Sequence, residues 1–193
     1  MATVIITGGG GFLGQCLATS LLQSPEVFVT LSTPNGKEEI ASDVVKIVLA
    51  DVAFSETDQL QPLVRDGIKS GSVELRSGSV ASEEFCFSLL SDQSSCNVSV
   101  FHLGAVMSGT GESNFDLCMD VNLRGSLNML EAARAHQSRV KFIYASAGAT
   151  IGSGAPTDWI QKEDVITDAT RATPHTTYGE FTTFICSPCF HDF

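Results

Sequence analysis

The chain has 193 residues, of which 43% are hydrophobic and 17% are charged, and its formal net charge is -11. This length and composition predict one soluble globular domain with a sizeable core. The acidic charge argues against nucleic acid and against an anionic membrane as partners, because both bind basic patches. A phosphate ligand stays compatible with this charge, since backbone amides can hold it without cationic side chains.

The cysteines and the first residues bear on the cellular compartment. The chain has six cysteines, and its first three residues lead into a β-branched run without a basic segment or a long apolar core. This start predicts a cytoplasmic protein with reduced thiols. Cys186 and Cys189 form a single CxxC pair with only His191 nearby. Because a structural zinc site needs four ligands, we predict no metal site.

A glycine-rich stretch follows the first predicted strand. Residues 4–6 are Val-Ile-Ile, residues 8–11 are four glycines, and a helical pattern follows them. A strand, a glycine turn and a helix in this order predict a dinucleotide-binding site. Gly8 permits the tight turn, Gly11 lets the backbone approach a pyrophosphate, and Gly14 lets the helix pack close to the strand. The alternative is a glycine-rich turn without a ligand.

Residues 7–14, Thr-Gly-Gly-Gly-Gly-Phe-Leu-Gly, resemble the TGxxGFxG signature of extended short-chain dehydrogenases/reductases, the NAD-dependent epimerase/dehydratase family. The resemblance covers roughly residues 4–179 and is strongest to the D-erythronate dehydrogenase branch. It implies an NAD(P) cofactor whose pyrophosphate lies at the start of the first helix. The cofactor contacts that it implies in this stretch are Gly8, Gly11, Phe12, Leu13 and Gly14.

The residues that would choose between NAD and NADP are not evident from the sequence. Residues 26–31 are predicted as the second strand. An Asp or Glu often ends this strand about 20 residues past the glycines and binds the ribose 2′-hydroxyl. Residues 31–33 are Leu-Ser-Thr instead. NAD is the expected cofactor, and the choice between NAD and NADP stays open.

The predicted third strand, residues 44–50, ends at Asp51 and Val52. The resemblance implies that these two residues contact the adenine, and the alternative is an Asp that only caps a turn or helix. Residues 53–97 are predicted to be an insertion between the third and fourth strands. Within it, hydrophobic spacing indicates short helices near residues 60–68 and 85–90, while residues 71–82 have the composition of a loop.

Residues 98–105 are predicted as the fourth strand and its exit turn, and they resemble the family sequence HLAA. The resemblance places Leu103, Gly104 and Ala105 against the cofactor, where small residues let the backbone approach a ligand closely. His102 is predicted to be a packed structural histidine rather than a base. Ser108, which follows, is a candidate substrate contact.

A long amphipathic helix is predicted over residues 115–133, with a break near Gly125. Within it, residues 121–126 resemble the family sequence VNxxGT. The resemblance implies that Asn122 braces the active-site backbone and can join a proton relay. The alternative is an ordinary surface asparagine.

The catalytic candidates follow the fifth predicted strand, residues 140–146. In the family that the sequence resembles, two hydroxyl residues follow this strand, and the second of them polarises the reacting oxygen. Ala147 stands at that second position. We therefore assign the role to the preceding residue, Ser146. Residues 172–179 resemble TPxxxYG, which implies that Tyr178 is the catalytic acid/base and also contacts the cofactor. The alternative for Tyr178 is a loop residue without a role.

The family lysine four residues after the tyrosine is replaced by Thr182. Residues four apart share one helix face, where a lysine would lower the tyrosine pKa from about 10 toward neutrality. Without that cation we expect slow turnover or none. β-branched residues and Pro188 also predict that the helix stops soon after Gly179.

Together these features predict an α/β, Rossmann-like, doubly wound, mostly parallel sheet, with an NAD(P)-binding domain at residues 1–180 and an aberrant tail at residues 181–193. The C-terminal substrate region of the family is expected to be absent. The implied function is hydride transfer between a sugar-acid hydroxyl carbon and nicotinamide. The alternatives are an inert dinucleotide-binding module and a nucleotide-sugar epimerase or dehydratase. The expected partner is a small molecule, with a homodimer possible as in the family.

Overall fold

A computed structural model describes residues 2–24, 26–33, 36–93, 97–138, 140–151 and 172–185, with backbone alone for residues 26–45. Two compact units form, one from Met1–Gly104 with Asn128–Tyr144 and one from Ala105–Leu127 with Ala145–Phe193. The CxxC pair, Cys186 and Cys189, lies outside the described residues.

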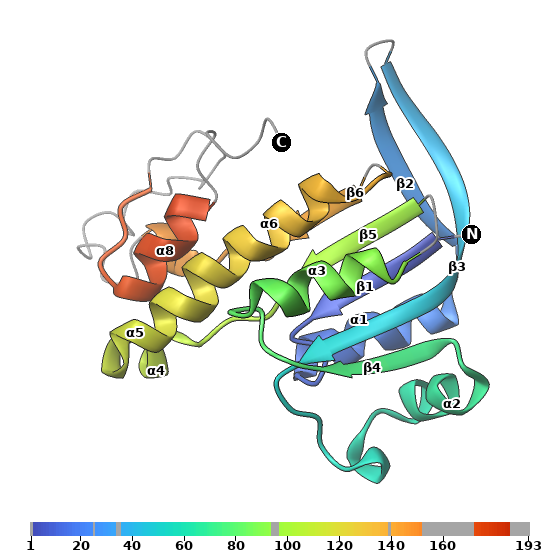
Figure 1. The fold of residues 1–193 in the computed structure, drawn as a ribbon, viewed down its shortest axis with the longest axis horizontal. Coiled ribbons are helices and arrows are strands. Elements are labelled where there is room, and N and C mark those ends of the chain that lie inside the picture. The colour runs from blue at the N-terminus through green and yellow to red at the C-terminus, as the bar shows by residue number, and fades with distance from the viewer. Residues whose placement is uncertain are drawn as a thin grey trace, which may run out of the picture. The chain divides into compact units, whose positions relative to one another are not determined.

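The first unit contains a parallel sheet with strand order β4-β3-β1-β5-β6 (Figure 1). The strand β1 is central, buried along its whole length, and pairs in parallel with both β3 and β5. Burial on both faces of the sheet explains the continuous apolar run in β1. The predicted Rossmann-like fold is therefore confirmed. The bounds of the parallel strands are Ala2–Thr7 for β1, Gly36–Asp51 for β3, Val73–Ser77 for β4, Asn97–His102 for β5 and Val140–Tyr144 for β6.

Helices cover both faces of this sheet (Figure 1). On one face, α1 (Phe12–Gln23) and α2 (Pro62–Ser70) pack on alternate residues of β1, β3 and β4. On the other face lie α3 (Glu83–Ser91) and α6 (Gly125–Ala135). A 3-10 turn, η1 (Thr57–Gln59), precedes α2. In the segments that the structure describes, no helix has both the length and the apolar character needed to cross a bilayer.

The predicted second strand is not part of the parallel sheet. The strand β2 (Glu26–Thr33) pairs antiparallel with the first half of β3, with Thr30 opposite Glu39. The second half of β3 then enters the parallel sheet directly beside β1, with Ile5 opposite Val48. The strand predicted as the third therefore occupies the position expected of the second.

The interpretation of residues 53–97 as an insertion is also wrong. These residues include β4, which pairs in parallel with β3, and α3, whose residues Cys86, Leu89 and Leu90 are buried. The predicted loop at residues 71–82 in fact contains β4. The sequence pattern did not reveal this strand, because charged side chains interrupt its apolar residues. Glu74 forms an ion pair with Lys46 at 2.6 Å and another with Arg76 at 3.2 Å.

The second unit contains short helices instead of the predicted continuous one. Residues 115–124 divide into α5 (Phe115–Cys118) and a π-helical turn, η2 (Met119–Arg124), which runs into α6 at Gly125. The other described elements are α4 (Ser108–Ser113), the 3-10 turn η3 (Gly148–Ile151) and α8 (Thr177–Ile185).

The helix α8 runs to Ile185, through the β-branched residues that were expected to end it soon after Gly179. The hydroxyls of Thr182 and Thr183 donate to the carbonyls of Tyr178 and Gly179, at 2.9 and 2.8 Å. Threonine hydroxyls that bond back to the preceding turn are satisfied within the helix. This explains why two β-branched residues do not end α8.

His102 makes the stability of the first unit depend on pH. Its Nδ1 lies 2.7 Å from Thr7 Oγ1, and burial lowers the His102 pKa from 6.5 to about 4. The folded protein binds a proton at His102 more weakly than the unfolded chain does. The contribution of neutral His102 to the free energy of unfolding is therefore fully present above pH 6.5 and is lost as the pH falls toward 4. Between about pH 7.5 and about pH 5.5, we predict a loss of about 1.4 kcal/mol in the free energy of unfolding.

Urea unfolding at the two pH values measures this loss. The His102→Gln variant should be less stable at the higher pH but should lose much less stability on acidification. Equal losses in the two proteins would contradict the assignment to His102.

Candidate functional site

The glycine turn between β1 and α1 leaves no room for side chains. Gly8 has a φ of +70°, and a Cβ added there would lie 2.9 Å from Gly104 N. A Cβ at Gly14 would lie 2.4 Å from the carbonyl oxygen of Gly8. The Gly11 N–H donates to that same Gly8 oxygen at 3.1 Å. The chain therefore turns tightly, and α1 begins directly against the end of β1.

The start of α1 is open to a ligand. Its N-cap residue is Gly11, and no side chain caps the helix. Phe12 and Leu13, which the resemblance implies as cofactor contacts, are 76% and 64% exposed. The first N–H groups of a helix lack partners within the helix and carry the positive end of its dipole. This arrangement can hold a pyrophosphate.

The structure places Asp51 beside the glycine turn. Its Oδ2 accepts from Gly10 N at 2.9 Å, and its Oδ1 accepts from Val52 N at 2.8 Å. Asp51 ends the strand next to β1, the position from which an acid reaches the ribose 2′-hydroxyl. Asp51 ends the third strand as predicted, but that strand lies beside β1, where the second strand was expected. The antiparallel hairpin between α1 and this part of β3 separates Asp51 from the glycines by more than the usual spacing.

The end of β5 lies against the same turn. Thr7 Oγ1 accepts from Gly104 N at 3.1 Å, and Leu103 N donates to Thr7 O at 3.2 Å. A Cβ at Gly104 would lie 3.1 Å from Gly8 N. The small residue predicted here is therefore required by the approach of two backbones. Ala105 is exposed and belongs to the second unit.

Gln15 supports the glycine turn and was not identified from the sequence. Its Nε2 donates to Gly10 O at 3.0 Å, and its Oε1 accepts from Gln61 N at 2.9 Å. The side chain thus links the turn to the start of α2. A glutamine in the first turns of a helix carries no sequence signal for this role.

In the second unit, Asn122 braces the backbone of Val106. Asn122 is 2% exposed, its Oδ1 accepts from Val106 N at 2.7 Å, and its Nδ2 donates to Val106 O at 2.9 Å. It lies in the π-helical turn η2, a distortion that is frequent at functional sites. The alternative of a surface asparagine is wrong, while the proton relay stays a prediction.

Tyr178 lies in the first turn of α8. Its N–H donates to Glu112 Oε1, and the Thr177 hydroxyl donates to Glu112 Oε2, both at 3.3 Å. Burial raises the pKa of Tyr178, and the neighbouring Cys118 thiol adds to the shift. A tyrosine that acts as a base near neutral pH needs a shift in the opposite direction.

Thr182 occupies the position where the family that the sequence resembles has a lysine. The side chain is 2% exposed, and its hydroxyl is bonded to the Tyr178 carbonyl. It carries no charge that could stabilise a phenolate. The residues at the start of α8 therefore fit an acid or hydrogen-bond donor better than a base at neutral pH.

Ser146 and Ser108, the predicted substrate contacts, are both exposed. The turn η3 after Ser146 packs directly on α8. The two are so close that a Cβ added at Gly179 would lie 2.5 Å from Ala149 O. Ser108 begins α4, and Glu112 near the end of α4 is the acceptor for Tyr178 N. The segments carrying Ser146, Ser108 and Tyr178 are thus neighbours within the second unit.

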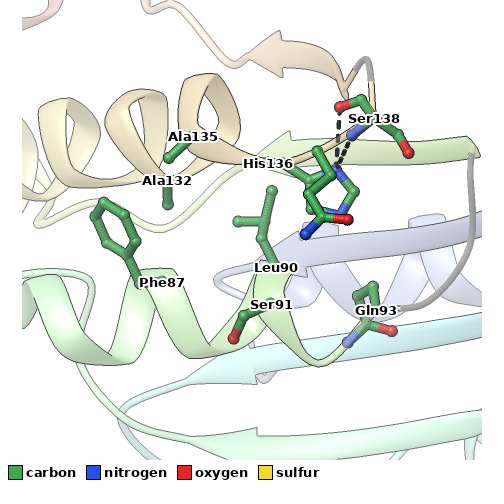
Figure 2. A pocket seen from close by; sticks show the side chains of 9 residues that line it. Phe87, Leu90, Ser91, Gln93, Ala132, Ala135, His136 and Ser138 are labelled. Carbon is green, nitrogen blue, oxygen red and sulfur yellow. Dashed lines mark hydrogen bonds between the residues drawn. The ribbon is translucent and has the colours of Figure 1, made fainter.

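The described surface includes one cavity away from the predicted site residues and another beside the start of α8. One of about 350 Å³ adjoins the C-terminal ends of α3 and α6, and Figure 2 shows Phe87, Leu90 and Ala132 with His136 bonded to Ser138. It contains none of the predicted site residues. The other, about 460 Å³, adjoins the start of α8 and is lined by Glu112, Phe115, Pro174, His175, Thr176, Thr177, Glu180 and Phe181.

Comparison with known proteins agrees with this geometry. The sequence profile of the NAD dependent epimerase/dehydratase family matches residues 4–181. The chain is 30% identical to D-erythronate dehydrogenase of Haemophilus influenzae over 176 residues, which cover 91% of this chain and 45% of that protein. It is 32% identical over 178 residues to D-erythronate dehydrogenase of Cupriavidus necator, covering 91% and 46%. The chain thus spans about half the length of the curated relatives it matches.

A solved structure supports the fold. UDP-glucose 4-epimerase from Bifidobacterium longum, solved in complex with NAD+ and UDP, superimposes with a TM-score of 0.68. The match covers 98% of this chain and 48% of the epimerase, at 19% sequence identity. At this identity the likeness concerns the fold alone.

The close approach of Gly14 to Gly8 predicts a large effect of a single methyl group. Gly14→Ala forces the turn or the helix to move, and we expect the free energy of unfolding to fall by about 2 kcal/mol, as in other overpacked sites. Gly109→Ala is the matched control, because a Cβ there meets nothing within 4 Å. Urea unfolding measures both variants. Equal stabilities of the two variants would contradict the close approach.

Proposed function

The chain belongs to the NAD dependent epimerase/dehydratase family, and we propose that it binds NAD and serves as an NAD-dependent oxidoreductase. The observation that carries this proposal is the combination of the side-chain-free glycine turn with Asp51 at the end of the neighbouring strand. A glycine turn alone would be a weak signal. An acid beside it adds the group that recognises the ribose.

The first unit has fitting groups for the pyrophosphate and for the adenosine ribose of the nucleotide. The N–H groups at the start of α1 would hold the pyrophosphate. Asp51 would accept a hydrogen bond from the 2′-hydroxyl of the adenosine ribose, which favours NAD because a carboxylate repels the 2′-phosphate of NADP. Gly104 would let the backbone after β5 approach the cofactor.

The proposed chemistry is oxidation of a hydroxyl group. Bound NAD+ supplies the acceptor for the hydride. Tyr178 would take the hydroxyl proton, slowly at neutral pH because burial raises its pKa. Ser146 would hold the hydroxyl oxygen, and Asn122 would keep the backbone of Val106 in place. The proposed substrate is a sugar acid resembling D-erythronate. It is supported by the names of two relatives that match this chain over about half of their length.

A second candidate is a dinucleotide-binding module without turnover. It is favoured by the raised pKa of Tyr178 and by the uncharged Thr182 at the lysine position. In that case NAD would bind to the first unit as above, and Tyr178 would stay protonated at neutral pH. Nucleotide affinity and turnover therefore have to be measured separately.

Asp51 is expected to set the preference between the two nucleotides. We predict that calorimetric titration finds tighter binding of NAD+ than of NADP+, and that Asp51→Asn reduces this preference about tenfold by removing the charge. Asp66→Asn is the control, because Asp66 is an exposed acid on α2 that pairs with the exposed Lys69 at 3.5 Å. A preference that Asp51→Asn leaves unchanged would count against Asp51 as the ribose ligand.

Thr182→Lys tests the proposed chemistry. A lysine four residues after Tyr178 should lower the tyrosine pKa, so we expect reduction of NAD+ by D-erythronate to rise at least about tenfold. Thr183→Lys, one residue further along α8, should show no gain. The gain should also disappear when Tyr178→Phe is added. NAD binding without a gain would favour the inert module over the oxidoreductase.

A further inference from the structure

The loop that follows β4 begins directly beside Asp51. The ends of β3 and β4 pair in parallel, with Asp51 opposite Ser77. The next residue, Gly78, donates its N–H to the Asp51 carbonyl at 2.9 Å. Residues 78–82 therefore continue from the strand end that neighbours the proposed ribose ligand.

A side chain from α6 holds this loop. Asn128 Nδ2 donates to Val80 O at 3.0 Å and to Ala81 O at 3.3 Å. The Cys86 thiol donates to the same Val80 oxygen at 3.2 Å. One amide group thus satisfies two successive carbonyls of a loop that lies far from it in sequence.

Both ends of the loop are fixed as well. A Cβ at Gly78 would lie 2.4 Å from the Phe85 ring, so the ring covers the first residue of the loop. At the other end, Ser82 Oγ accepts from Phe85 N at 3.3 Å and caps α3. The loop is therefore held at its start, at its middle and at its end.

The strand order relates the loop to the nucleotide. In a parallel α/β sheet, ligands bind at the carboxyl ends of the strands. Under the proposed function, the pyrophosphate lies at the end of β1 and the ribose at the end of β3. The base, which is attached to that ribose, then reaches the end of β4, where residues 78–82 lie.

We infer that Asn128 is a positioning residue of the nucleotide site, which holds residues 78–82 in the conformation that receives the base. This inference rests on the proposed binding of NAD. It assigns a role in ligand recognition to a half-buried helix residue whose side chain donates to the loop backbone. The chemistry requires a donor at this position, because two carbonyl oxygens face the amide nitrogen.

Asn128→Asp tests the role at nearly constant size. A carboxylate oxygen would face the Val80 and Ala81 carbonyls, and the loop would be repelled. We expect the full chain to bind AMP about tenfold more weakly, while nicotinamide mononucleotide, which lacks the adenine, binds with unchanged affinity. A residue with a merely structural role would weaken both ligands together.

Gln93→Glu is the matched control for a buried amide. Gln93 is 6% exposed, and its Nε2 donates to Leu89 O at 3.1 Å, beyond the other end of α3. This variant should bind AMP like the original chain. If circular dichroism shows that Asn128→Asp is unfolded, Asn128→Ala replaces it, with an expected loss of AMP affinity of about threefold.

The outcomes separate the two proposals. A folded Asn128 variant with unchanged AMP affinity would overturn the inference while leaving NAD binding intact. Equal weakening of AMP by Gln93→Glu would also overturn it. An original chain that binds neither AMP nor nicotinamide mononucleotide would overturn the proposed function itself.

Discussion

The arrangement of the first unit depends on the contact between the backbones of Gly8 and Gly14. Because neither residue has a Cβ, α1 can start directly at the end of β1. That start brings the unpaired N–H groups of the helix to the carboxyl edge of the sheet. The neighbouring strand ends then complete the surroundings, with Asp51 bonded to Gly10 and Gly104 bonded to Thr7. Each of these bonds requires the glycine backbone to lie where a side chain would otherwise stand.

In the described part of the second unit, hydrogen bonds hold the start of α8, and Thr182 at the lysine position carries no charge for Tyr178. Asn122 fixes Val106, Glu112 accepts from the start of α8, and η3 packs on Gly179. These contacts position the tyrosine without activating it, since burial raises its pKa. The residues for nucleotide binding and those for chemistry therefore differ in how well they suit their proposed roles. This difference makes binding and turnover separate questions for this protein.

The sequence predicted the features that depend on local backbone chemistry. The glycine turn, the parallel sheet, the buried His102 and the short residue at Gly104 all follow from strand runs and from residues without side chains. It failed where partners come from distant segments. β4 was missed because its charged residues are satisfied by ion pairs with Lys46 and Asp92.

The place in the sheet of the strand that ends at Asp51 was not predictable for a similar reason. An antiparallel hairpin between α1 and the sheet lengthens the spacing to the glycines, so counting residues pointed to Leu31, Ser32 and Thr33 instead. The contributions of Gln15 and Asn128 are hydrogen bonds to distant backbone atoms, which no local pattern reveals.

The most direct test of nucleotide binding is an NMR titration of the isotopically labelled chain with NAD+, following backbone amide shifts. We predict the largest shifts at Gly11–Gly14 and at Asp51, with small changes along α2. Shifts that spare the glycine turn, or no shifts at saturating NAD+, would contradict it.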